Sequence, residues 1–245
     1  MTFRSGQPAP PILQGAADWH QLIYATRGVM TVYTDDGAWV VPPHRGVWIP
    51  AGFRYRLEMS GEVALRMLYV LARKRRAARL CSVVNVTPLL RELIVRTNLI
   101  GALDSGIPEQ RRLIAVIYDE LNVLTSVPLQ LPLPQNRRAA QFAALAASET
   151  TGELPLKEML RRSGLSRRSL ERIFRAETAM SLGQWLRRQK LLNALRRLAA
   201  GESVKTIALE LGYNSASAFV AMFRRELGQT PKRYFEVMPP TEQSL

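Results

Sequence analysis

The stretch ELGYNSASAFVAMFRRELGQTPKRYF, residues 210–235, carries the pattern that decides the fold of the C-terminal half. Gly212 follows a short apolar run, and glycine readily adopts the positive φ that a tight turn between two helices requires. Beyond the turn, Phe219 and Phe223 are four residues apart and therefore share one face of a helix. This arrangement predicts a helix-turn-helix unit. One such unit alone is weak evidence, so a second, correctly spaced copy is needed.

The second copy is SGLSRRSLERIFRAETAMSLGQWL, residues 163–186. Leu170 and Phe174 repeat as Phe219 and Phe223, each pair offset by 49 positions, and Gly164 corresponds to Gly212 at an offset of 48. Two copies of one supersecondary unit arise by chance far less often than one. The C-terminal half is therefore predicted to contain two helix-turn-helix units.

A continuous helix is predicted between the copies, from Ser181 to Gly201, because this segment lacks proline and ends in a glycine suited to a helix C-terminus. About 19 helical residues span roughly 28 Å. Two recognition helices held by such a connector would be close to one turn of B-DNA apart, roughly 34 Å, and would reach successive major grooves.

The composition favours a polyanionic partner, since 34 lysines and arginines outnumber 20 acidic residues. The excess of basic residues is the same in both halves of the chain, because 1–140 and 141–245 each contain 17 basic and 10 acidic residues. The single cysteine, Cys81, excludes an internal disulfide and a cysteine-based zinc site. No signal-peptide core and no run of 18 apolar residues occurs, so a cytoplasmic protein without a membrane partner is expected.

The predicted fold class is α+β, with a small N-terminal β-barrel, a helical hairpin and an all-α C-terminal domain. Short β-rich runs with turn signals fill residues 1–79, and Asp36-Gly37 predicts a type I′ hairpin turn. Residues 80–125 contain two apolar-striped helices, the first capped by Thr87. These helices either cover the barrel or form a dimer interface. The proline-rich segment 126–136 is predicted to be a linker, and 137–238 the DNA-binding domain.

Residues 141–235 resemble the AraC/XylS family of bacterial transcription regulators, on the motifs GLSRRSLERIF and ALELGYNSASAFVAMFRRELGQTPKRYF and the long connecting helix. One departure is Leu160, where the family usually has alanine, as Ala208 in the second copy. The N-terminal half resembles the cupin-type sensor domain that precedes this module in many members, on DWHQLIYATRGVMTV, VVPPHRGVWIPAGFRYRL and VALRMLYV. The resemblance implies a sequence-specific regulator of double-stranded DNA, controlled by a small effector.

Candidate DNA contacts lie on the two predicted recognition helices. Ser166 is placed to cap the first, and an exposed arginine at its N-terminal part can pair with guanine O6 and N7. Family position implies base contacts by Arg168, Glu171 and Arg172 and phosphate contacts by Arg167 and Arg175. In the second unit the outward residues are small, which favours shape-based readout with cationic side chains on the backbone. Its candidates are Ser215, Ala216, Ser217 and Ala221 for bases and Arg224, Arg225, Lys232 and Arg233 for phosphates.

Candidate effector residues are His20, Tyr24, Trp48 and Tyr55, although each of these aromatics could equally fill the core. By this resemblance, the positions that are histidines in metal-binding cupins correspond to Gly15, Ala17 and Tyr55 of this chain. His20 and His44 alone make a poor site, so no metal or cofactor is expected.

No nucleophile–base pair or phosphate-binding loop is apparent, so an enzyme is a weaker alternative. A non-specific nucleic-acid binder is also a weaker alternative, because two copies of the motif are held at a fixed spacing. An effector-independent repressor of a neighbouring gene is a further alternative. A homodimer and a contact with RNA polymerase complete the expected partners.

Overall fold

The computed structural model describes residues 2–3, 18–72, 80–127, 129–148 and 154–235. Contacts divide the chain into two compact units. The first comprises Met1–Asp35 with Trp39–Gln130, and the second comprises Asp36–Ala38 with Leu131–Leu245. The division after Gln130 lies within the segment 126–136, and the domain boundaries given above stay predictions.

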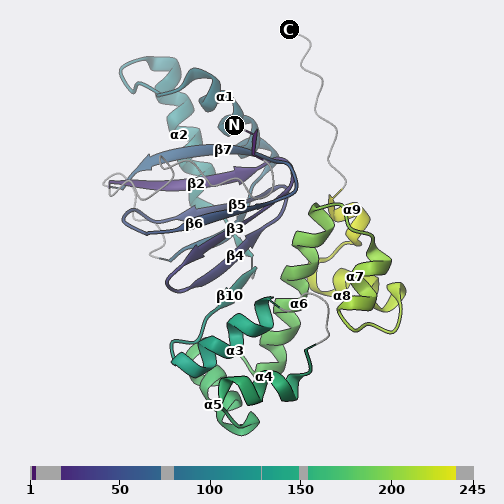
Figure 1. The fold of residues 1–245 in the computed structure, drawn as a ribbon. Helices are drawn as coiled ribbons and strands as arrows, with labels where there is room; N and C mark the ends of the chain where they lie inside the picture. The colour runs from purple at the N-terminus through teal and green to yellow at the C-terminus, as the bar shows by residue number, and fades with distance from the viewer. Residues whose placement is uncertain (1, 4–17, 73–79, 128, 149–153, 236–245) are drawn as a thin grey trace. The chain divides into compact units, whose positions relative to one another are not determined.

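The N-terminal half consists of short strands, as the alternating β-rich runs predict (Figure 1). They form a six-stranded sheet in the order β1-β7-β2-β5-β8-β9 and a four-stranded sheet in the order β10-β4-β3-β6. The pairings that the structure defines are antiparallel. The strands are β1 (Thr2–Phe3), β2 (Trp19–Ala25), β3 (Val29–Thr34), β4 (Gly37–Val41), β5 (Arg45–Ile49), β6 (Arg56–Ser60), β7 (Val63–Leu71), β8 (Ser82–Asn85), β9 (Ser126–Val127) and β10 (Gln130–Pro132).

The predicted fold class is confirmed, with a cupin-like N-terminal half followed by helices, and the sheets of the N-terminal half are not closed into a complete barrel. The sheets are cupin-like and remain two separate hydrogen-bonded sheets within the described part of the chain. Strands β1, β9 and β10 at their edges have only two or three residues, and β10 ends in Pro132, which has no N–H to extend a ladder. A side-chain hydrogen bond still joins the two sheets, since Tyr55 Oη donates to Gln21 Oε1 at 2.6 Å.

The hairpin between β3 and β4 forms where it was predicted, with a different turn. Asp35 and Asp36 are the two turn residues. Among described non-glycine residues only His44 and Ala179 have positive φ, so a type I′ turn is excluded there. Gly37, the first residue of β4, has φ 153° instead. Gly37 therefore lies at the start of β4 and not at the centre of the turn.

The helical hairpin consists of α1 (Pro88–Ile100) and α2 (Pro108–Asn122). Thr87 caps α1 as predicted, because its side chain accepts a hydrogen bond from Leu90 N. Figure 1 shows both helices lying beside the sheet near β7. One apolar core joins them to the sheet, formed by Leu22, Tyr24, Trp48, Leu68, Val70, Val84, Leu90, Leu93, Ile94, Ile117 and Leu121. Covering the sheet is thus one established role of the hairpin.

The proline-rich segment is extended, as predicted, but it is no free spacer. Its residues form β9, which pairs with β8, and β10. The side chains of Leu129 and Leu131 are 1% and 5% exposed. The alternation of leucine with proline, which shows no helical period, is therefore a buried strand pattern.

Helices form the rest of the described chain, as predicted. They are α3 (Arg137–Ser148), α4 (Leu156–Ser163), α5 (Arg167–Thr178), α6 (Leu182–Ala199), α7 (Val204–Glu210), α8 (Ala216–Leu227) and α9 (Pro231–Phe235). The predicted connector is α6, which Ser181 and Gln184 begin with a reciprocal capping box. Gly201 follows its end with φ 90°. The 18 helical residues extend roughly 27 Å.

Replacing Gly28 with alanine tests the close packing of the β2–β3 turn. Gly28 has φ 72°, and an added Cβ would lie 2.5 Å from the Glu62 carbonyl oxygen. Gly52 has φ 81° with no atom within 4 Å, so it is the matched control. We expect Gly52→Ala to lower the unfolding free energy by about 1 kcal/mol and Gly28→Ala by more than about 2 kcal/mol, in urea titrations. Equal losses would contradict the close approach.

Candidate nucleic-acid interface

The first helix-turn-helix consists of α4, a turn at Gly164 and α5. Gly164 has φ 64°, which confirms the positive φ predicted for the turn. Ser166 caps α5, since its hydroxyl accepts a hydrogen bond from Ser169 N at 3.1 Å. One side of α5 packs into the core, where Leu170 and Phe174 are fully buried. The buried pair fixes which face of α5 is left for a partner.

Each helix-turn-helix unit is built around a cluster of buried aromatic side chains. In the first unit, Phe142 of α3 and Trp185 of α6 both meet Phe174 edge-to-face, with ring centroids 6.0 and 5.1 Å away. In the second unit, Phe223 of α8 contacts Phe219 and Tyr234 at 5.8 and 5.5 Å. Phe174 and Phe223 are the repeat-equivalent positions, so the repeat in sequence is a repeat in packing.

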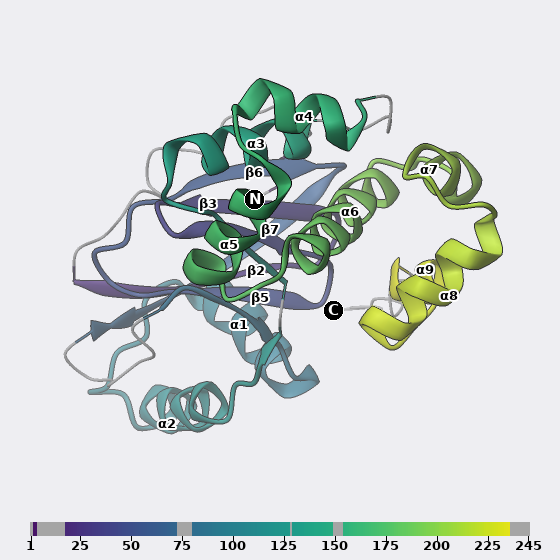
Figure 2. The same ribbon diagram turned by 90° about the horizontal axis from the view of Figure 1, so that it is seen from below.

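Helix α6 connects the two units, and Figure 2 shows α3–α5 at one end and α7–α9 at the other. In the first half of α6, Trp185 Nε1 donates to the Pro132 carbonyl at 2.7 Å. Further along, Lys190 Nζ donates to the Leu211 carbonyl at 2.8 Å. Arg197, near its end, pairs with Glu202 and with Glu210 of α7. Polar contacts thus attach the first half of α6 to β10 and its second half to the second helix-turn-helix unit.

Four arginines project from α5, as the sequence predicts. Arg167, Arg168, Arg172 and Arg175 are all exposed. Within the described part of the chain, Arg168 and Arg172 form no ion pair. They lie four residues apart and therefore share one face.

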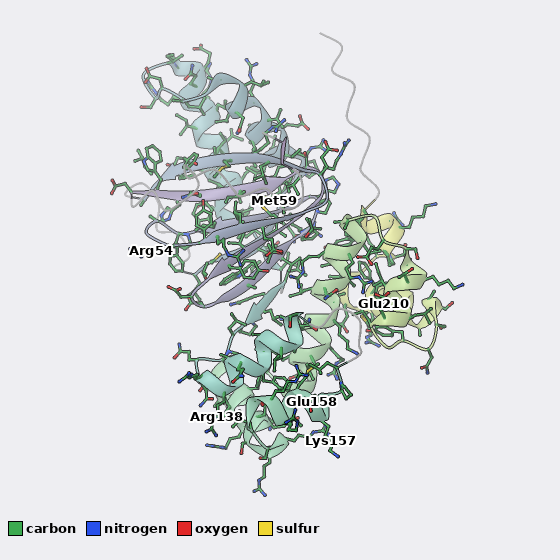
Figure 3. The ribbon with its side chains drawn as sticks, in the orientation of Figure 1. Arg54, Met59, Arg138, Lys157, Glu158 and Glu210 are labelled. Atoms are coloured by element: carbon green, nitrogen blue, oxygen red, sulfur yellow. The ribbon has the colours of Figure 1, made fainter. Side chains whose placement is uncertain are left out.

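The basic residues of α4 are arranged differently. Figure 3 labels Lys157 and Glu158 on α4, the helix that packs against α3. Glu158 accepts hydrogen bonds from Arg161 and Arg162, and these bonds hold the pKa of its carboxyl at about 2. Both arginines are partly neutralised by this carboxylate. The four arginines of α5, by contrast, form no ion pair within the described part of the chain.

Two acidic residues of α5 have structural partners that the sequence did not reveal. Glu171 Oε2 accepts a hydrogen bond from Leu182 N, at the start of α6, at 3.2 Å. Glu177 Oε2 accepts from Gln135 N and Asn136 N, just before α3, at 2.8 and 3.0 Å. A carboxylate at a helix N-terminus is stabilised by the helix dipole. Only the Oε1 atom of Glu171 is left for the base contact that family position implies.

The second unit presents small side chains, as predicted. Ser215 caps α8, because its hydroxyl accepts a hydrogen bond from Ala218 N at 3.1 Å. Ser217 and Ala221 are exposed, whereas Ala216 is half-buried. Exposed cationic residues surround them, namely Arg224, Arg225, Lys232 and Arg233. Ala208 is fully buried in α7, whereas the repeat-equivalent Leu160 of α4 is half-buried.

The four candidate effector residues of the N-terminal half do not form one site. Antiparallel pairing places Leu22 opposite Trp48, so Trp48 shares a face with His20, Leu22 and Tyr24. The rings of His20 and Trp48 are 5.3 Å apart, and Tyr24 and Trp48 belong to the core beneath α1 and α2. Tyr55 instead bonds Gln21, whose side chain alternation places on the other face. Periodicity alone could not assign these faces.

The described residues contain no group of three potential metal ligands. His20 Nδ1 accepts a hydrogen bond from Ala51 N at 3.0 Å. His44 has φ 63°, and burial, followed by the charges of Arg91 and Arg45, lowers its pKa. No helix among the described residues is long and apolar enough to cross a membrane.

The fold and its exposed helices define a DNA-binding regulator in which a sensor-type β domain is followed along the chain by two helix-turn-helix units. A model of a helix-turn-helix domain matches residues 159–236, and a model of an AraC-like ligand binding domain matches residues 14–105. The HTH-type transcriptional regulator NimR of Escherichia coli strain K12 is 32% identical over 214 residues, covering 87% of this chain and 78% of that relative. The chain belongs to the AraC family of DNA-binding transcription regulators and has a ligand-binding N-terminal domain.

Shorter relatives match the C-terminal part alone. The regulatory protein SoxS of Salmonella typhimurium strain LT2 is 38% identical over 82 residues, which are 33% of this chain and 77% of SoxS. Among solved structures, the DNA-binding domain of AdpA in complex with a target DNA is 32% identical. The match covers 40% of this chain and 89% of that chain, with a TM-score of 0.36.

Replacing Glu171 with alanine tests its contact with α6. The variant loses the hydrogen bond to Leu182 N, and we expect the unfolding free energy of the C-terminal compact unit, which contains both residues, to fall by about 1 kcal/mol. Glu226→Ala is the matched control, because Glu226 pairs only with its exposed neighbour Arg225 and such pairs contribute little. Urea titration followed by circular dichroism measures both. A loss no larger in Glu171→Ala than in Glu226→Ala would refute the structural role.

Proposed function

We propose that this regulator reads a specific DNA sequence mainly through α5, with α8 recognising DNA shape. The observation that supports this most is the pair Arg168 and Arg172, which are exposed on one face of α5 near its capped N-terminus. An arginine there can donate two hydrogen bonds to guanine in the major groove. Glu171 Oε1 lies on the same helix and accepts from cytosine N4. Arg167 and Arg175 contact phosphates.

The second unit contributes positioning more than base discrimination. Its outward residues Ser215, Ala216, Ser217 and Ala221 offer hydroxyl and methyl contacts but no bidentate donor. The exposed side chains of Arg224, Arg225, Lys232 and Arg233 hold phosphates. Such contacts set orientation and add a salt-dependent, sequence-independent share of the affinity.

A small effector bound by the N-terminal domain would shift the populations of DNA-binding states. The contacts that the sequence predicts there are His20, Tyr24 and Trp48 on one face of the sheet and Tyr55 on the other. An effector-independent repressor is the alternative. RNA polymerase is the further partner proposed for an activator.

A homodimer through α2 is supported by an exposed apolar stripe. Val116 of α2 and Val123, the residue that caps the C-terminus of α2, are 40% and 66% exposed, and their spacing of seven residues places them along one side of the helix. Arg112 and Asp119 occupy the same stripe, four residues before and three after Val116. In an antiparallel pairing of two copies, Arg112 of each copy lies opposite Asp119 of the other. This complementarity favours a second copy of the chain as the occupant.

Replacing Arg172 and Arg225 separately tests the division of roles. Binding to an operator selected from a random DNA library, titrated at several salt concentrations, is the measurement. We expect Arg172→Ala to cost about 1–3 kcal/mol and to relax the preference at one base position. Arg225→Ala should weaken binding to all sequences alike and reduce the salt slope by about one. Equal, sequence-independent losses for both variants would refute these assignments.

Changing the stripe on α2 tests the dimer. The double variant Val116→Glu, Val123→Glu puts like charges into the proposed contact, so we expect dimers to become monomers in sedimentation equilibrium. Leu209→Glu is the control, since Leu209 is 56% exposed on α7, outside the stripe. A monomeric wild-type protein, or a variant that dimerises normally, would exclude this interface.

A further inference from the structure

A pocket of about 490 Å³ lies along β7, beneath the helical hairpin. Its volume is within the range of small-molecule sites, roughly 300–1,000 Å³. All of its lining residues belong to the N-terminal compact unit and come from the start of β2, β7, the end of α1, the connection to α2 and α2 itself. None of the predicted effector residues lines it.

The pocket is uncharged throughout. Its fifteen lining residues include no acidic, basic or histidine side chain. Trp19, Tyr69 and Tyr118 supply aromatic surface, and Leu68 and Ile117 are among the aliphatic residues. A charged ligand would lose its hydration here without gaining a counter-charge, whereas a neutral apolar ligand would be favoured.

One buried polar atom marks a point for a hydrogen bond. Thr97 of α1 lines the pocket and is 7% exposed. Its Oγ1 has no hydrogen-bond partner among the described residues. Buried polar groups in proteins are normally hydrogen-bonded, and this hydroxyl is covered in the structure, so a ligand gains the bond when the Thr97 side chain turns toward the pocket. A ligand with one N–H or oxygen would satisfy it.

We propose that this pocket is the effector site and takes a neutral, largely apolar ring compound with one hydrogen-bonding group, held by Thr97. This inference rests on the proposed function, in which an effector controls DNA binding. The site is separate from the space between the two sheets, where Tyr55 and Gln21 are already bonded to each other.

The pocket also provides a route for regulation. Asn98 of α1 fastens the hairpin to the sheet, because its Nδ2 donates to the Met67 carbonyl of β7 at 2.9 Å. Both residues line the pocket. A ligand beside this bond changes how α1 and α2 lie on the sheet. The outward face of α2 carries the proposed dimer stripe, so occupancy is coupled to the pairing of two DNA-binding domains.

Two matched probes test the chemistry on the full chain. N-phenyl-1-naphthylamine is neutral with one N–H, and 1-anilinonaphthalene-8-sulfonate has the same rings with a negative charge. Fluorescence titration should show saturable binding of the neutral probe, at least ten-fold tighter than binding of the sulfonate. Absent saturation, or equal affinity for the two probes, would overturn the proposed ligand class.

Three variants locate the binding. Ala102 is an exposed lining residue, so Ala102→Phe fills the pocket and should abolish binding of the neutral probe. Thr97→Val keeps the shape, removes the hydroxyl and should weaken binding several-fold. Arg54→Phe adds an exposed ring elsewhere in the same unit and should change nothing. Unaltered binding in Ala102→Phe and Thr97→Val, with thermal unfolding as in the wild type, would overturn the site.

DNA affinity, measured on the selected operator with and without the neutral probe, tests the regulatory role. We expect at least a three-fold change in the wild type and no change in Ala102→Phe. Sequence-specific binding that ignores a bound probe would overturn the pocket as an effector site and leave the proposed DNA reading intact. Loss of sequence preference in the protein without probe would instead refute the proposed DNA reading.

Discussion

The DNA-binding half depends on the packing of Phe174 and Phe223 at equivalent positions of its two recognition helices. Each ring is fully buried and is surrounded by further aromatic side chains. Because large rings in the core define one orientation of a helix, the opposite face of α5 or α8 is left for a partner. Helix α6 then joins both clusters through a continuous run of hydrogen-bonded turns.

The electrostatics of the interface follow from which arginines already have a carboxylate partner. Arg161 and Arg162 share Glu158, and Arg197 is committed to the second unit through Glu202 and Glu210. None of the α5 arginines forms an ion pair with Glu158, Glu202 or Glu210. The total charge of +14 therefore says less about DNA binding than the location of the unpaired part does.

A shared apolar core joins the sheet of the N-terminal domain to its helical hairpin. Leu22 and Tyr24 of the sheet pack with Leu90, Ile94 and Ile117 of the hairpin, so neither layer buries its apolar face alone. A ligand pocket bordered by both layers lies where a small displacement alters the helices without unfolding the sheet. Such a site suits a population shift, because only contacts that differ between two states can bias them.

The sequence by itself determined the elements whose signals are local or repeated. The caps at Thr87 and Ser166, the turns at Gly164 and Gly212 and the duplicated aromatic spacing could all be predicted, because each depends on residues a few positions apart. Tertiary structure alone decided the rest. Whether Trp48 and Tyr55 share a site depends on strand register, and the partners of Glu171 and Glu177 lie eleven and about forty residues away. The strands hidden in the proline-rich segment, the open edges of the sheets and the pocket beside β7 likewise arise from contacts between distant segments, which periodicity does not encode.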